Sequence, residues 1–273
     1  MNKKIIFALG IVFVLLLSVV FRSKIGQLVF VGKPGEGQVS PSPTPSVSEM
    51  PIPSGSPMPS ASDTPFPEPV KPEVYKGRPL DEVRPVSDEV KLFSESQKQD
   101  IYNSIGNLAK AIKENPEFFN GMIQLGTLKK TIGDFEGARD IWEYASLKRP
   151  QNSVSFANLG ELYWRYLHQY NQAELNFKTS IKNDPANPGV YVSLSGVYFY
   201  SMKEKAELAD DVILDGINAN PKSTDLLRAL ASLYERRGEY VKAIESWQKI
   251  LAQNPQDTAV AAAIDSLKKK LAN

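Results

Sequence analysis

The fold is decided by the stretch at positions 224–257, which reads TDLLRALASLYERRGEYVKAIESWQKILAQNPQD. A proline closes this stretch, and prolines recur upstream at a nearly constant interval, at Pro116, Pro150, Pro185, Pro221 and Pro255. A period of roughly 35 residues is typical of stacked repeats, in which each unit buries its apolar face only against its neighbours. The sequence therefore predicts a repeat architecture.

Three further positions recur in each unit and predict a helical hairpin. An alanine stands twelve residues before the closing proline, at Ala138, Ala173, Ala209 and Ala243. A large apolar residue stands eight residues before it, at Trp142, Phe177, Ile213 and Trp247. A small residue follows a leucine earlier in the unit, at Gly126, Gly160, Ser195 and Ala231. Small side chains let two helices approach closely, and we expect the bulky residue to fill the space between units. The proline ends the second helix.

This pattern resembles the tetratricopeptide repeat, a helix-turn-helix unit with a small residue on its first helix, alanines on its second and a terminal proline. Four units match, covering roughly half of the chain, at about residues 119–152, 153–187, 188–223 and 224–257. The second and third units are slightly longer than the others, with extra residues around 168–170 and 202–205, and we expect longer loops or helix ends there. Gly216 and Ile213 depart from the repeat pattern, so we expect the third unit to stack least tightly.

Both ends of the stack show helical spacing. Apolar residues within 258–272 predict a capping helix, with lysines in its last turn that suit the helix dipole. Another apolar stripe predicts a helix at about residues 95–114, which reads as the second helix of a half-repeat. The predicted fold class is therefore all-α, a solenoid of helical hairpins that occupies residues 90–273.

The first 89 residues have a different composition. Residues 5–21 are almost wholly apolar and predict a transmembrane helix within an N-terminal anchor region, residues 1–31. A cleaved signal peptide is the alternative, but bulky residues occupy the place of a small-x-small cleavage site. Residues 32–89 are rich in proline and serine and predict a disordered linker, although the more apolar residues 74–93 are expected to dock on the first helices. We expect a single-pass membrane protein with a cytoplasmic N-terminus and with its linker and repeats on the extracytoplasmic side.

Composition argues against several function classes. The chain has no cysteine, which excludes thiol catalysis, disulfides and cysteine-based metal sites, and its single histidine, His168, falls in a hairpin loop. From residue 90 onward 23 basic residues face 22 acidic ones, whereas a nucleic-acid-binding protein normally has a basic excess. We expect no enzymatic activity, no cofactor, no metal and no nucleic-acid partner.

The resemblance implies a concave groove lined by the first helices, and stepping along these helices from the small residue gives its lining. Trp164 and Phe199 are expected to anchor an apolar side chain of a bound segment, with Glu161, Arg228 and Glu235 fixing its ends. The alternative is that the two aromatic side chains pack into the hairpin turns or against the docking segment. The groove residues are predicted to be Asn120, Ile123, Thr127, Lys130, Glu161, Trp164, Val192, Phe199, Arg228 and Glu235.

The function predicted from this organisation is a membrane-tethered scaffold that binds a peptide or helix of a partner protein in the groove, in cell-envelope assembly or secretion. A self-associating structural protein of the envelope is the alternative. A cell-wall hydrolase is a third reading, which lacks any recognisable nucleophile, base or metal cluster.

Overall fold

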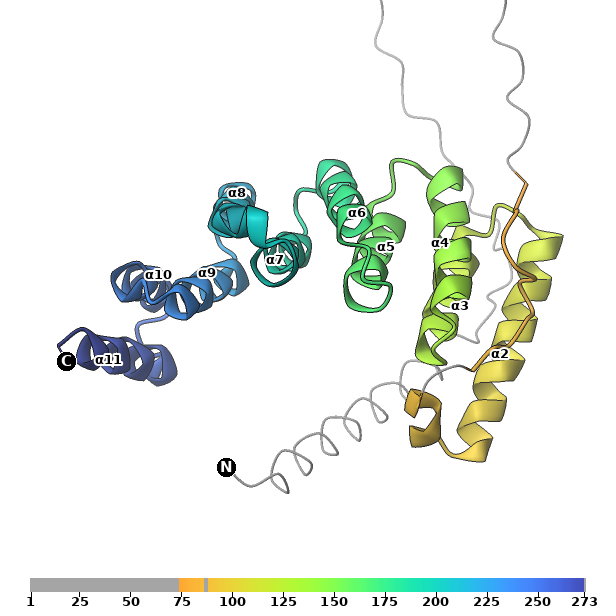
Figure 1. The fold of residues 1–273 in the computed structure, drawn as a ribbon, viewed down its shortest axis with the longest axis horizontal. Coiled ribbons are helices and arrows are strands. Elements are labelled where there is room, and N and C mark those ends of the chain that lie inside the picture. The colour runs from red at the N-terminus through yellow and green to blue at the C-terminus, as the bar shows by residue number, and fades with distance from the viewer. Residues whose placement is uncertain (1–73, 86–87, 273) are drawn as a thin grey trace, which may run out of the picture. The chain divides into compact units, whose positions relative to one another are not determined.

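The protein is described by a computed structural model at residues 74–85 and 88–272, and within these ranges it is all-α, without a strand (Figure 1). A short helix, η1 (Asp88–Leu92), precedes a longer one, α2 (Glu95–Glu114). The remaining elements, in chain order, are α3 (Phe119–Thr131), α4 (Phe135–Lys148), α5 (Ser153–Arg165), α6 (Tyr170–Asn183), α7 (Pro188–Gly196), η2 (Val197–Ser201), η3 (Lys203–Leu208), α8 (Ala209–Ala219), α9 (Thr224–Arg237), α10 (Tyr240–Gln253) and α11 (Thr258–Ala272). The predicted fold class is confirmed.

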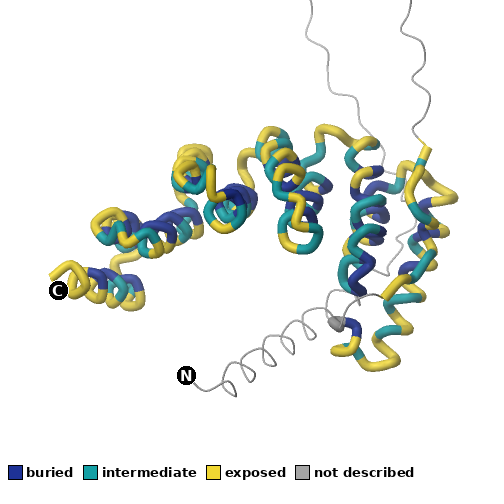
Figure 2. Tube along the Cα trace, in the orientation of Figure 1, coloured by how far each residue is buried: buried dark blue, intermediate teal, exposed yellow. Residues whose placement is uncertain are grey.

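The helices pair as the repeat period predicts. Hairpins α3–α4, α5–α6 and α9–α10 form the first, second and fourth units, and α7 pairs with α8 in the third. The predicted flanking helices are also present as α2 and α11. Figure 2 shows buried and exposed positions alternating along each helix, as expected of elements that bury one side against their neighbours.

No helix in the described ranges combines the length and apolar character that crossing a membrane requires. The anchor predicted at residues 5–21 and the linker up to residue 73 lie outside these ranges. The linker prediction from residue 74 onward can be compared with the structure directly.

Glycines allow the first and last hairpins to turn sharply. Gly133 and Gly238 both have positive φ angles, in the left-handed region where a side chain is strained. After Gly133, the Asp134 carboxylate accepts a hydrogen bond of 3.0 Å from the Gly137 backbone N–H and so caps the start of α4. These turns follow from local sequence alone.

In the first two hairpins the small residue of the first helix lies directly against the bulky residue of the second. A Cβ atom added to Gly126 on α3 would overlap the indole of Trp142 on α4, and one on Gly160 would lie 2.5 Å from the Phe177 ring. Trp142 Nε1 also donates a hydrogen bond to the Ile123 carbonyl, at 3.1 Å. The bulky residue therefore packs inside its own unit, and the expectation that it fills the space between units is wrong.

Neighbouring units are joined by a tyrosine three residues after the small residue. The hydroxyls of these tyrosines donate to a carboxylate on the second helix of the preceding unit. The pairs are Tyr163 with Glu143, Tyr198 with Glu174, and Tyr234 with Asp210. Burial, together with these carboxylates, raises the pKa of each tyrosine, so the hydroxyl remains a donor at neutral pH.

The first unit has Lys129 at this tyrosine position, because a different element precedes it. Lys129 is 1% exposed, and its ammonium donates to the Glu82 carbonyl at 2.7 Å and to Asp134 at 3.2 Å. The side chain of Arg78 lies 3.3 Å from the Asp134 carboxylate. Residues 74–85 thus supply the polar partners that a preceding hairpin would otherwise provide.

Residues 74–85, which we call the docking segment, also contact α4, the second helix of the first hairpin. Tyr75 packs edge-to-face on Tyr144, with ring centroids 5.4 Å apart, and the Arg78 backbone N–H donates to Asp140 at 3.2 Å. Leu80 is buried in the core. The predicted docking is confirmed, but it involves both helices of the hairpin and begins upstream of the domain boundary that was predicted at residue 90.

The extra residues of the middle units lengthen their turns, as predicted. In the second unit the loop after α5 contains His168, which has a positive φ angle. In the third unit α7 continues into a π-helical turn, η2, and a 3₁₀-helix, η3, before α8 begins. Both irregular turns face the same junction, between the second and third units.

The close approach at Gly126 can be tested against a glycine that has room around it. Gly126→Ala places a methyl group against the Trp142 ring and should lower the free energy of unfolding by roughly 1–3 kcal/mol. Gly106→Ala on α2 is the control: nothing lies within 4 Å of its added Cβ. Its better helix propensity should raise stability by about 0.5–1 kcal/mol. Urea unfolding followed by circular dichroism would measure both, and equal effects would contradict the packing described here.

Candidate functional site

The predicted groove residues lie on α3, α5, α7 and α9, except Phe199, which lies on η2. In the described structure none of them is fully buried. Asn120, Thr127 and Arg228 are exposed, and the other seven are half-buried: Ile123, Lys130, Glu161, Trp164, Val192, Phe199 and Glu235. An ion pair of 3.4 Å joins two of them, Lys130 on α3 and Glu161 on α5, across neighbouring units.

Trp164 connects the second unit to the third. Its indole N–H donates to the Ser201 hydroxyl at 2.9 Å, and a Cβ on Gly196 would lie 2.5 Å from its Cη2. Phe199 packs edge-to-face on Tyr200, with centroids 4.9 Å apart. Both side chains therefore pack at the hairpin turn of the third unit, which agrees with the alternative reading of these aromatic residues.

The charged residues that were expected to fix the ends of a bound segment already have partners. Glu161 pairs with Lys130, and Glu235 accepts a hydrogen bond of 2.7 Å from the Trp247 indole. Arg228 lies 3.2 Å from the Asp257 carboxylate, just before α11. These bonds hold neighbouring elements together, so a partner would have to compete with them.

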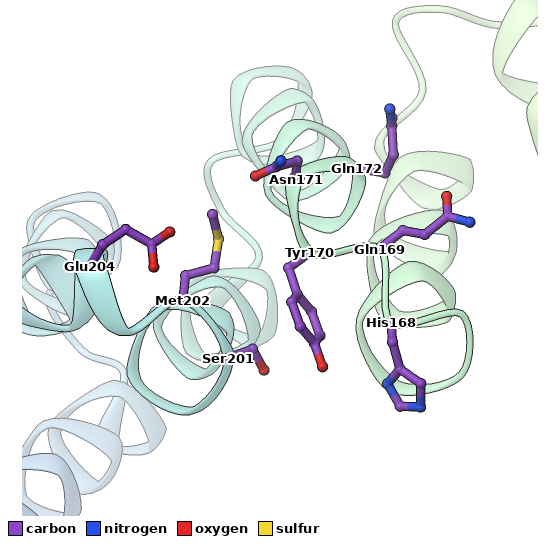
Figure 3. Close-up of a pocket in the computed structure, with 8 residues that line it drawn as sticks. All are labelled: His168, Gln169, Tyr170, Asn171, Gln172, Ser201, Met202 and Glu204. Atoms are coloured by element: carbon purple, nitrogen blue, oxygen red, sulfur yellow. The ribbon is translucent and has the colours of Figure 1, made fainter.

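An open hollow of about 540 Å³ lies where the irregular turns of the second and third units meet (Figure 3). In Figure 3 the Tyr170 side chain lies between the turn that carries His168 and the turn that carries Ser201 and Met202. The lining residues are His168, Gln169, Tyr170, Asn171, Gln172, Ser201, Met202 and Glu204. Polar and aromatic groups on such turns suit contacts with another polypeptide.

A second hollow of about 430 Å³ adjoins the first and shares His168, Tyr170 and Ser201 with it. Its remaining lining residues are Trp164, Arg165 and Tyr200. The two hollows form what we call the turn cleft, lined by the residues just named for both. It lies beside the predicted groove position Trp164.

Two arginines lie over aromatic rings of the turn cleft, Arg165 over Trp164 and Arg236 over Tyr200. The Arg165 guanidinium carbon lies 4.2 Å from the Trp164 ring centroid, and that of Arg236, on α9, lies 5.8 Å from the Tyr200 ring centroid. Cation–π contacts of this kind stabilise a guanidinium without using its N–H donors. Within residues 74–85 and 88–272, neither arginine makes a hydrogen bond or an ion pair with a carboxylate.

Metal-binding chemistry finds no support in the described residues, where no three His, Cys, Asp or Glu side chains come together as possible ligands. His168 is exposed in its loop, with its ring 6.3 Å from that of Tyr170. The arrangement at the turn cleft offers stacked cations, aromatic faces and hydroxyls. Such groups bind and orient another molecule.

Residues 224–257, which form the hairpin α9–α10, match the family model of the tetratricopeptide repeat. The same hairpin, with its small residue, its paired helices and its closing proline, precedes it three times in the structure. Residues 224–257 thus form a tetratricopeptide repeat, and the three hairpins before it follow the same pattern.

Known proteins resemble this chain over part of its length. It is 27% identical over 106 residues to the formate-dependent nitrite reductase complex subunit NrfG of Escherichia coli O157:H7, an alignment that covers 38% of this chain and 53% of NrfG. The chain thus spans about half the length of this relative. Among solved structures, YrrB, described as having an unusual peptide-binding site, aligns with a TM-score of 0.45 at 17% identity over 61% of this chain and 84% of YrrB. PilF of Pseudomonas aeruginosa aligns with a TM-score of 0.48 at 17% identity over 67% and 90%.

Among the residues that line the turn cleft, the repeat pattern identified Trp164 alone. Arg165, Tyr170, Tyr200 and Arg236 lie outside the groove positions that the repeat pattern gives. The available signal was the extra length of the second and third units, which places irregular turns side by side. The length of a repeat unit does not show which side chains its turn brings together with those of the next unit.

A carboxylate on α6 secures the turn of the third tetratricopeptide unit. Glu174 accepts hydrogen bonds from Tyr198 at 2.8 Å and from Lys178 at 2.7 Å, and it also pairs with Lys205 on η3. Burial would raise the pKa of the Glu174 carboxyl, but these hydrogen bonds outweigh it and lower the pKa to about 2. The ionised form therefore stabilises the fold.

This stabilisation should disappear in acid. Because the pKa of Glu174 is lower in the folded than in the unfolded chain, its contribution is present above about pH 4.5 and is lost as the pH falls toward 2. Glu174→Gln should lower the free energy of unfolding by about 2 kcal/mol at pH 7 and by much less at pH 3. Glu245→Gln, at an exposed site on α10, is the control and should have little effect at either pH. An equal loss at both pH values would show that charge is not the cause.

Proposed function

We propose that this protein is a membrane-tethered adaptor that binds a peptide or helix of a partner protein on the open face of its first helices. The observation that carries the proposal is that this face stays uncovered while the rest of each first helix packs into the stack. Thr127 and Ser232, on α3 and α9, are exposed there, and the turn cleft adjoins the face between them. A face of this kind, with aromatic and charged groups in reach, suits a bound segment.

The proposed setting is the cell envelope, in its assembly or in secretion. The apolar residues 5–21 would anchor the chain with its N-terminus in the cytoplasm, and the proline- and serine-rich linker would place the repeats on the extracytoplasmic side. The relative from Escherichia coli is named as a subunit of a reductase complex, and a role exercised through protein contacts fits that name.

Photo-crosslinking from defined positions would test the binding face. With p-benzoylphenylalanine at Thr127 or Ser232, irradiation of cells should give discrete adducts with a second protein, because these positions face the bound segment. Leu175 is the matched control: it is 60% exposed on the second helix α6 and should give none. Adducts from Leu175 alone would place the interface on the second helices and overturn the proposal.

The same experiment reports on self-association, the alternative function. Its support is that the second helices each present a large exposed apolar side chain, namely Leu147 on α4, Leu175 on α6 and Val241 on α10. If the chain assembles with itself through these helices, the adduct from Leu175 will have twice the mass of the chain.

Protease added to intact cells would test the orientation. The repeats should be digested from outside while a cytoplasmic marker protein stays intact, because the proposal places residues 74–273 beyond the membrane. The control is the same treatment after the cells are opened, which should digest both. Repeats that resist protease until the cells are opened would contradict the extracytoplasmic location.

A further inference from the structure

We propose that the two stacked arginines at the turn cleft, Arg165 and Arg236, recognise an acidic segment of the partner protein through its side-chain carboxylates. This inference rests on the proposed function, since it assigns the chemistry of the segment that the adaptor binds. It concerns residues outside the groove positions given by the repeat pattern.

The first step is that both guanidinium groups are exposed and accessible to a partner. Each is exposed and is held over an aromatic ring, Arg165 on Trp164 and Arg236 on Tyr200. A cation–π contact uses none of the N–H donors of the guanidinium, so they stay available to bind a carboxylate with two parallel hydrogen bonds. Stacking also restricts the side chain before the partner arrives, which reduces the entropy lost on binding.

The second step is that both stacks border one hollow. Trp164, Arg165 and Tyr200 line the second hollow of the turn cleft, and the Trp164 indole is bonded to Ser201, the neighbour of Tyr200 in the chain. Arg236 lies on the Tyr200 ring. One extended segment passing over this hollow would therefore meet both arginines.

The third step is the local charge. None of the six residues that line the second hollow is acidic, and the adjoining hollow contributes a single carboxylate, Glu204. Three carboxylates on α5, α9 and α8 are engaged elsewhere: Glu161 with Lys130, Glu235 with Trp247, and Asp210 with Arg237 and Tyr234. Arg165, which lines the hollow, and Arg236, which lies over Tyr200 beside it, thus have no carboxylate partner in the described part of the protein.

Other arginines show that this arrangement is selective. In the described ranges Arg78, Arg84, Arg139, Arg228 and Arg237 each pair with a carboxylate. Arg149 resembles Arg165 and Arg236, because it is exposed, lies 5.1 Å from the Phe119 ring centroid and has no carboxylate partner there. Its ring partner Phe119 does not line the cleft, however, whereas Trp164 and Tyr200 do. Arg149 therefore provides a control that separates stacking and charge from position.

The test is binding of a fluorescein-labelled octaglutamate peptide to the full chain in mild detergent, measured by fluorescence anisotropy at about 0.1 M salt, where surface charges are partly screened. Arg165→Gln with Arg236→Gln should weaken binding by at least about tenfold, a change that corresponds to about 1.4 kcal/mol. The control, Arg149→Gln with Lys268→Gln, removes the same charge elsewhere and should change affinity by less than about twofold. Arg165→Lys with Arg236→Lys should lose most of the affinity, because lysine offers no planar, two-point donor.

Three results would overturn the proposal: no binding of octaglutamate by the wild-type chain, equal weakening by the control pair, or tighter binding of a labelled octathymidylate, which would indicate a nucleic acid. The photo-crosslinks from Thr127 and Ser232 then separate this failure from failure of the proposed function. If those adducts persist in the Arg165→Gln, Arg236→Gln variant, the adaptor role stands and only the acidic character of the segment falls.

Discussion

The close approach of two helices at one small residue is the contact on which the rest of the structure depends. At Gly126 the Trp142 ring occupies the space that a side chain would need, and its indole N–H satisfies a backbone carbonyl of the facing helix. This contact sets how the two helices of a hairpin sit. In the fourth unit Ala231 replaces the glycine; there the equivalent Trp247 is half-buried, and its indole N–H bonds to the Glu235 side chain instead of a backbone carbonyl. Where alanine replaces glycine, the tryptophan at this repeat position therefore donates its hydrogen bond to a side chain and not to a backbone carbonyl.

Contacts between hairpins follow from that geometry. Once each hairpin is fixed, the tyrosine three residues after the small residue reaches the preceding second helix, where a carboxylate accepts its hydroxyl hydrogen. A buried polar group must be bonded, so tyrosine and carboxylate have to occur together. Where no full hairpin precedes, Lys129 replaces the tyrosine, since its partners there are a backbone carbonyl and the Asp134 carboxylate. The docking segment therefore occupies the place of a preceding hairpin and supplies a hydrogen-bond partner to the first unit.

The repeat period predicted the hairpins, the flanking helices 95–114 and 258–272 and the docking of residues near 75, because each depends on apolar spacing or turn chemistry within a short stretch of chain. The site was less accessible to such reasoning. Trp164 bonds to a residue 37 positions away and Arg228 to one 29 positions away, so their roles depend on how successive units meet. Spacing could not show that several of the predicted groove residues are already bonded to neighbouring elements.

The turn cleft shows why the departures from the repeat carry the most functional information. A regular unit has no room for extra residues, so the third unit absorbs them in a π-helical turn and a 3₁₀-helix, and the second in a loop with His168 in the left-handed region. Such irregular turns have poorer hydrogen-bond geometry than an α-helix and are common at functional sites. Here their result is local: Tyr200 and Ser201 are brought beside Trp164, and a hollow opens between the units. Regular repeats provide the stiff support, and the irregular turns place aromatic and cationic groups where a partner can reach them.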